Sequence, residues 1–151
     1  MDSKEVKILI ICDDENHLKN LIKPIHKRDL EIAAAAGRPG AKVNVSTFAR
    51  VSDLNGTESK SNINWDVIVL SSAGRADPPY DLWVLRHKFP DPLRIAELDI
   101  NTQERVYHFT CCWGADDVFI GNQDMVNVII ENLIERRQRI KELRHQRIVL
   151  H

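Results

Sequence analysis

The sequence predicts an α/β fold in which five βα units build a central parallel sheet. Near-continuous aliphatic runs, typical of strands buried on both faces, alternate with segments whose apolar residues have helical spacing. Stretches rich in Gly, Pro, Asn and Ser separate the two kinds of segment and predict turns. The length of 151 residues suits one domain with its own core.

Five segments are predicted to be strands. The first and third are almost wholly aliphatic, which indicates strands buried on both faces. The second alternates in polarity and is rich in β-branched residues, which also predicts a strand. In chain order the five segments are residues 6–12, 43–48, 65–71, 93–98 and 117–121.

Helical spacing of apolar residues predicts a helix after most of these strands. The first helix should bend at Pro24 and continue through Ala33 and Ala36 until Gly37 ends it. A short helix is expected at residues 49–54. The remaining predicted helices cover residues 80–89, 102–113 and 122–147, and the last is unusually long.

Composition excludes several classes of protein. The formal net charge is −1, so the chain has no overall bias toward nucleic acid or an anionic membrane. No apolar run approaches the ~20 residues of a membrane span. Three cysteines without a C-x-x-C pair argue against a disulfide framework or structural zinc site. We therefore expect a reducing, cytoplasmic setting.

Three stretches together resemble the response-regulator receiver domain. "KILIICDDE" resembles the family's first strand, which ends in an acidic pair that binds Mg²⁺. "WDVIVLS" resembles the third strand, which closes on the phosphorylated Asp. "WGADDVFIGN" resembles the Gly-Ala-Asp-Asp turn and fifth strand. The resemblance implies a flavodoxin-like (βα)5 receiver fold and a role in two-component signal transduction.

Position by position, the chain departs from the family at its reactive residues. The phosphoacceptor Asp falls on Ser71, the Thr or Ser that ends the fourth strand on Asp99, and the Lys after the fifth strand on Gly121. Asp99 and Gly121 thus stand at the positions of the family's switch residues. Only the acidic pair, Asp13 and Asp14, matches. The resemblance therefore implies a divergent receiver, or pseudo-receiver.

The missing residues remove the usual phosphoryl-transfer chemistry. Ser71 offers no carboxylate nucleophile and Gly121 no cation, so we expect no phospho-aspartate signalling and no enzymatic activity. Asp13, Asp14 and Asp99 should converge at the strand ends, where one or two carboxylates and water can hold Mg²⁺. An acidic cleft without function is the alternative, as is a hydrolytic metal site. No cofactor is required.

The last predicted helix outruns a receiver domain, so we divide the chain into a receiver-like domain, residues 1–137, and a helical extension, residues 138–151. Ile140 and Leu143 lie beyond the sheet they could cover. We expect them to support a parallel homodimer, although a solvated tail is equally compatible with the pattern. Basic residues outnumber acidic ones here, but no nucleic-acid motif accompanies them.

These observations favour a phosphorylation-independent, receiver-like signalling module that acts by protein–protein interaction or dimerisation. Two alternatives stay open. One is a metal- or phosphate-handling enzyme that uses the acidic cluster on the same fold. The other is the N-terminal receiver fragment of a DNA-binding regulator.

Overall fold

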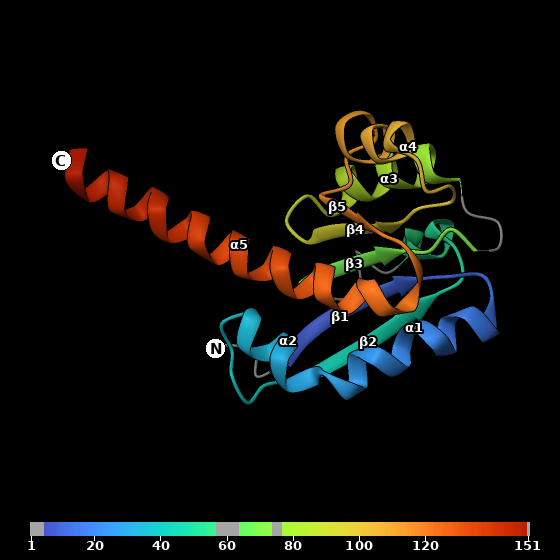
Figure 1. Ribbon diagram of the computed structural model, residues 1–151, viewed down its shortest axis with the longest axis horizontal. Helices are drawn as coiled ribbons and strands as arrows, with labels where there is room; N and C mark the ends of the chain where they lie inside the picture. The colour runs from blue at the N-terminus through green and yellow to red at the C-terminus, as the bar shows by residue number, and fades with distance from the viewer. Residues whose placement is uncertain (1–4, 57–63, 74–76, 151) are drawn as a thin grey trace.

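The five predicted strands form one parallel sheet in the order β2-β1-β3-β4-β5 (Figure 1). The computed structural model describes residues 5–56, 64–73 and 77–150 of the chain. The order confirms the flavodoxin-like α/β class that the sequence predicted. The strands are β1 Glu5–Ile11, β2 Lys42–Phe48, β3 Val67–Leu70, β4 Leu93–Glu97 and β5 Asp117–Phe119.

Helices cover both faces of the sheet (Figure 1). Alternate strand residues face opposite ways, so Ile8 and Ile10 pack on one side while Leu9 and Ile11 pack on the other. The first face is covered by α1 Glu15–Lys27, α2 Asp29–Ala35 and α5 Gly121–Leu150. The second is covered by the 3₁₀ turn η1 Val51–Gly56, α3 Pro78–Lys88, α4 Gln103–Tyr107 and the π-helical turn η2 His108–Cys112.

The first helical segment differs from the single bent helix that the sequence predicted. Pro24 lies inside α1, and the helix ends instead at Arg28, whose φ of −123° and ψ of 30° are not helical. The Arg28 side chain is held by Glu31 and by Asn127 of α5. The break redirects the chain, so that Ile32 and its neighbours in α2 reach the core.

The segment before β5 is also less regular than predicted. A single helix was expected over residues 102–113, but α4 gives way after one turn to the wider η2. Thr102 caps α4 by accepting a hydrogen bond from the Arg105 amide. The wider turn keeps Phe109 buried and places its ring against Trp113, with centroids 4.9 Å apart. Tertiary packing therefore overrides the regular helical spacing here.

The helix α5 extends well past the sheet (Figure 1). Arg136 and Arg137 tie it to the body by hydrogen bonds to the carbonyls of Asp91 and Ala34. The expected division after residue 137 falls inside this continuous helix. Among the helices of the described residues, none combines the length and the apolar character that crossing a bilayer requires.

Candidate functional site

The carboxyl ends of β1, β3 and β4 meet at one edge of the sheet. The chain turns from one side of β1 to the other between β2 and β3, and ligands of such sheets bind at this kind of switch point. Ser71 directly follows β3, and Glu97 is the last residue of β4. Both side chains are almost fully buried, with exposed fractions of 1% and 6%.

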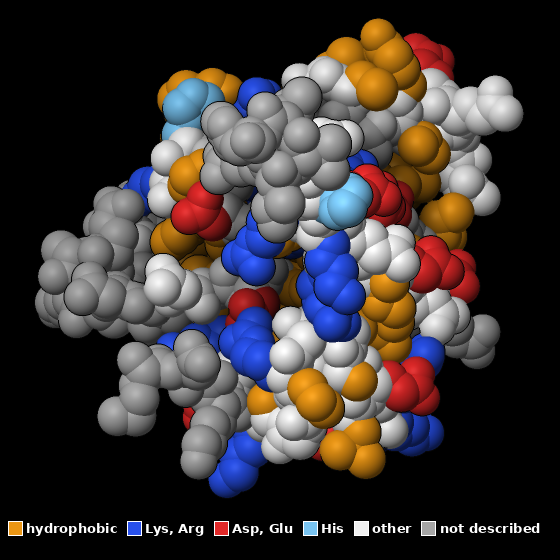
Figure 2. All heavy atoms as spheres, turned by 90° about the vertical axis from the view of Figure 1, so that its left-hand side faces the viewer, with side chains coloured by type: hydrophobic (Ala, Val, Ile, Leu, Met, Phe, Trp, Pro, Cys, Tyr) orange, Lys and Arg blue, Asp and Glu red, His pale blue; other side chains and the backbone are white. Residues whose placement is uncertain are grey.

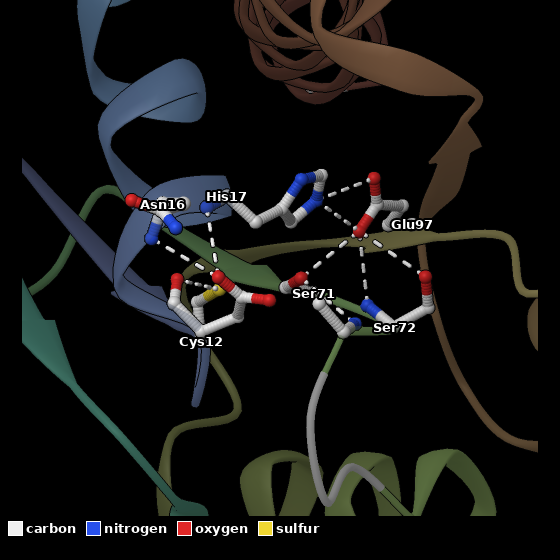
Figure 3. Close-up of polar contacts among 8 residues, drawn as sticks. Cys12, Asn16, His17, Ser71, Ser72 and Glu97 are labelled. Atoms are coloured by element: carbon white, nitrogen blue, oxygen red, sulfur yellow. Dashed lines mark hydrogen bonds and ion pairs between the residues drawn. The ribbon is translucent and has the colours of Figure 1, made fainter.

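Glu97 is the centre of a polar network at this edge (Figure 3). Its Oε1 accepts hydrogen bonds from Ser71 Oγ at 2.9 Å, from the Ser72 amide at 3.0 Å and from Ser72 Oγ at 3.2 Å. His17 Nε2 lies 2.9 Å from each carboxylate oxygen. A buried carboxylate needs such partners, because its desolvation is otherwise costly. The network therefore satisfies Glu97 from within the chain.

The first turn of α1 positions His17. Asp14 is the N-cap of this helix, and its Oδ1 accepts hydrogen bonds from the amides of Asn16 and His17. With the backbone fixed there, the His17 ring points at Glu97 (Figure 3). A carboxylate only accepts hydrogen bonds, so His17 Nε2 is the donor in this contact. When the ring is protonated, the contact becomes an ion pair.

This arrangement does not activate Ser71 as a nucleophile. A Ser–His pair needs an imidazole nitrogen at the hydroxyl, whereas here Glu97 lies between the hydroxyl and the ring. Ser71 Oγ also accepts a hydrogen bond from the Ala73 amide at 3.1 Å. The hydroxyl therefore serves as a structural bridge between β4 and the start of the next loop.

The expected meeting of three acids does not occur. Asp14 is engaged as the helix cap, and Asp13 Oδ2 lies 3.7 Å from Arg50 Nε. Asp99 lies beyond β4 and forms an ion pair with Arg105, whose hydrogen bond lowers the pKa of the Asp99 carboxyl. Within the described residues, no group of three His, Cys, Asp or Glu side chains is placed to hold a metal.

The assignment of Asp99 to the end of the fourth strand was therefore wrong, because β4 ends at Glu97. The assignment came from counting back from Gly114 across a regular helix. The π-helical turn η2 takes more residues per turn than an α-helix does. The true strand end accordingly lies earlier in the chain.

The backbone conformation at position 121 favours glycine. Its φ is +72°, in the left-handed region that favours glycine, and a Cβ added there would meet no atom within 4 Å. Backbone strain rather than lack of space thus opposes a larger residue. The position that the resemblance equates with the family's Lys would strain any lysine placed there.

A small cleft of about 180 Å³ lies beside the network, at the ends of β1 and β3. Asp13, Arg50, Ser71, Tyr80 and Asp81 are among its lining residues. Burial raises the pKa of the Asp81 carboxyl above its ordinary value of 3.8. The cleft thus carries charges of both signs.

Sequence reasoning missed both principal members of the network. It singled out neither His17 nor Glu97. One local signal for Glu97 existed, since it is the only acid within the predicted strand "LRIAEL". No comparable signal marks His17, because its partner lies 80 residues away in the chain.

Comparison with known proteins gives the fold but no family. No family model and no curated protein matches the chain. Among solved structures, a two-component response regulator from Clostridium difficile has a TM-score of 0.63 at 16% identity, covering 87% of this chain and 98% of that one. The receiver domain of Francisella response regulator 1452 gives the same values.

A response regulator receiver domain protein from Clostridium thermocellum is similar as well. Its TM-score is 0.58 at 16% identity, and the match covers 89% of this chain and 98% of that one. At such identities the likeness concerns the fold alone. The chain therefore has the flavodoxin-like fold of receiver domains.

Proposed function

We propose that this chain is a phosphorylation-independent, receiver-like signalling module that acts through protein–protein contacts. The observation that carries the proposal is the buried Glu97 carboxylate hydrogen-bonded to Ser71. The resemblance equates Ser71 with the phosphoacceptor Asp and the end of the fourth strand with a Thr or Ser. In this chain the hydroxyl of Ser71 follows β3, where the family has the acid. The carboxyl group of Glu97 ends β4, where the family has the hydroxyl.

The exchange places a buried, hydrogen-bonded carboxyl group at this edge. Glu97 links β4 to the loop after β3 through Ser71 and Ser72, and to α1 through His17. Because these contacts are already formed within the chain, neither a phosphoryl group nor a metal is needed to assemble them. We infer that the loops at this edge are held in one arrangement without phosphorylation.

Accessibility supports the same conclusion. Ser71 is 1% exposed and its hydroxyl is engaged on both sides, which opposes attack by a kinase. Asp13 lies by Arg50 and one carboxylate oxygen of Asp14 caps α1, so both acids are partly engaged within the chain. We infer that the module needs no resident Mg²⁺ and catalyses no reaction.

The output we propose is contact with protein partners, including a second copy of the chain. Ile140 and Leu143 are 46% and 60% exposed on the part of α5 that extends from the body. Exposed aliphatic side chains on one segment are typical of an interaction surface. The three cysteines are free, in keeping with the reducing, cytoplasmic setting that we expect.

Incubation with acetyl phosphate and Mg²⁺ tests the proposal. Intact mass should stay unchanged, and amide NMR shifts of Ser72 and Glu97 should not move. Ser71→Ala and Glu97→Gln serve as the matched variants that would identify an acceptor. A phosphoryl adduct that either variant abolishes would refute phosphorylation independence.

A further inference from the structure

A groove of about 570 Å³ lies between the extending part of α5 and the amino-terminal ends of β4 and β5. Leu93, Ile140 and Leu143 form its apolar lining, and Asp116, Asp117 and Glu135 are its acids. Figure 2 views the molecule from the side to which α5 points, and shows Lys and Arg side chains gathered on this face with acidic side chains among them. Arg136 and Arg139 also line the groove, so exposed apolar surface lies beside three acids that outnumber two cations.

The end of α5 carries the opposite charge. Lys141 and Arg144 are exposed and follow the groove along the helix. Arg144 lies nine residues after Glu135, which is about 13 Å along a helix axis at 1.5 Å per residue. The cations near the end of the helix are thus too far along it to neutralise the groove acids of the same chain.

We propose that the groove receives the end of α5 from a second copy of the chain, in antiparallel orientation. The inference rests on the self-association proposed above and gives its geometry. If the two helices cross between Arg139 and Ile140, Leu143 of each copy faces Arg136 of the other. Arg144 of each copy then reaches Glu135 of the other, near the acids at the start of β5.

The groove acids are available for this contact. Asp116 accepts a hydrogen bond from the Arg94 amide, and Asp117 accepts one from the Asn132 side chain, both neutral donors. Glu135 pairs with Arg139 one turn along the helix, with side chains 60% and 73% exposed. Such exposed pairs are weak, so Glu135 can also accept the arriving Arg144.

The sequence suggested a parallel pair. Such a pair would place Arg136, Arg139 and Arg144 each beside the same residue of the second chain. Like charges at neighbouring positions of paired helices are unfavourable. The acids of the groove would also remain far from the cations near the helix end. Antiparallel pairing moves Arg136 and Arg144 away from the same residues of the other copy, and it buries Ile140 and Leu143 of both copies.

A charge exchange tests the pairing by sedimentation. Glu135→Arg and Arg144→Glu should each raise the dimer dissociation constant, by about tenfold, and the double variant should restore it. Both residues lie on the exposed helix surface, so the fold should persist. Failure of the double variant to recover affinity would overturn the antiparallel contact.

Disulfide trapping gives an independent readout of orientation. In a Cys111→Ser, Cys112→Ser background, chains with Arg136→Cys and with Leu143→Cys are mixed in equal amounts and oxidised. The antiparallel pair predicts mixed 136–143 dimers by intact mass, whereas a parallel pair would yield 136–136 and 143–143 dimers and overturn the inference. A wild-type chain that is monomeric at micromolar concentration would overturn the proposed self-association as well.

Discussion

His17 Nε2 lies 2.9 Å from each carboxylate oxygen of Glu97, so the first turn of α1 supplies a donor to the last residue of β4. The contact joins two elements that are not neighbours in the chain. Because Glu97 is buried and Ser71 and Ser72 also donate to it, loss of its charge should be costly.

Glu97→Gln should lower the free energy of unfolding by about 2 kcal/mol, since it weakens hydrogen bonds to a charged group. Urea denaturation measures the change. Glu131→Gln is the matched control, because Glu131 is exposed on α5 outside the groove and its replacement should cost less than about 0.5 kcal/mol. Equal effects of the two substitutions would show that the Glu97 network contributes little stability.

The pH dependence of stability should reveal the ion pair of Asp99. The hydrogen bond from Arg105 lowers the pKa of Asp99, so its stabilisation is present above the ordinary value of 3.8 and is lost as pH falls through the lower folded value. Wild type should therefore exceed Asp99→Asn in stability at about pH 6, and the two should converge in acid. A difference that persists unchanged at about pH 2 would contradict this assignment.

The contribution of Asp81 to the free energy of unfolding should depend on pH with the opposite sign. Burial raises its pKa, so the ionised carboxyl weakens folding as pH rises from 3.8 through the folded value. Asp81→Asn should therefore gain stability relative to wild type over that range, as measured by urea unfolding at stepped pH. The Asn oxygen can still accept the hydrogen bond from the Asp77 amide. A constant difference between the two proteins would exclude burial as the cause.

Millimolar Mg²⁺ should leave the melting temperature unchanged. A ligand stabilises only in proportion to RT ln(1 + [L]/Kd), and Asp13, Asp14 and Glu97 already have partners within the chain. Calorimetry with Mg²⁺ or EDTA measures this. A Mg²⁺-dependent rise that disappears in Asp13→Asn would instead establish a metal site at the end of β1.

Gly121→Lys should lower the free energy of unfolding by about 1 kcal/mol, although the side chain has open space. The cause is the φ of +72° at this position. Ile120→Lys is the control, because it adds the same side chain to an exposed neighbour without positive φ. A variant at Gly121 as stable as wild type would show that the backbone there relaxes freely.

Replacing both Ile140 and Leu143 with Ser should abolish self-association without unfolding the chain, because both side chains are exposed. Light scattering should report a monomer, as it should for a chain truncated after Arg137. Ile134→Ser, which changes another exposed aliphatic residue of α5 outside the groove, should leave the dimer intact. A dimer that survives in the truncated chain would move the contact to the body.

The sequence by itself determined the five strands and their parallel arrangement. Runs such as "VIVL" in β3 are buried on both faces. Their burial can be predicted because the apolar residues are consecutive in the chain. The length of α5 followed from the same kind of local, periodic pattern. Helix ends were less predictable, because the break at Arg28 depends on contacts with Glu31 and with Asn127 of α5.

Only the tertiary structure decided which side chains meet where the strands end. Glu97 and His17 are 80 residues apart, and nothing local in either segment pairs them. Asp99 was placed by counting, and the π-helical turn at His108 changed the count. The physical reason is that burial patterns repeat along the chain, whereas hydrogen bonds between distant side chains depend on the three-dimensional path that brings them together.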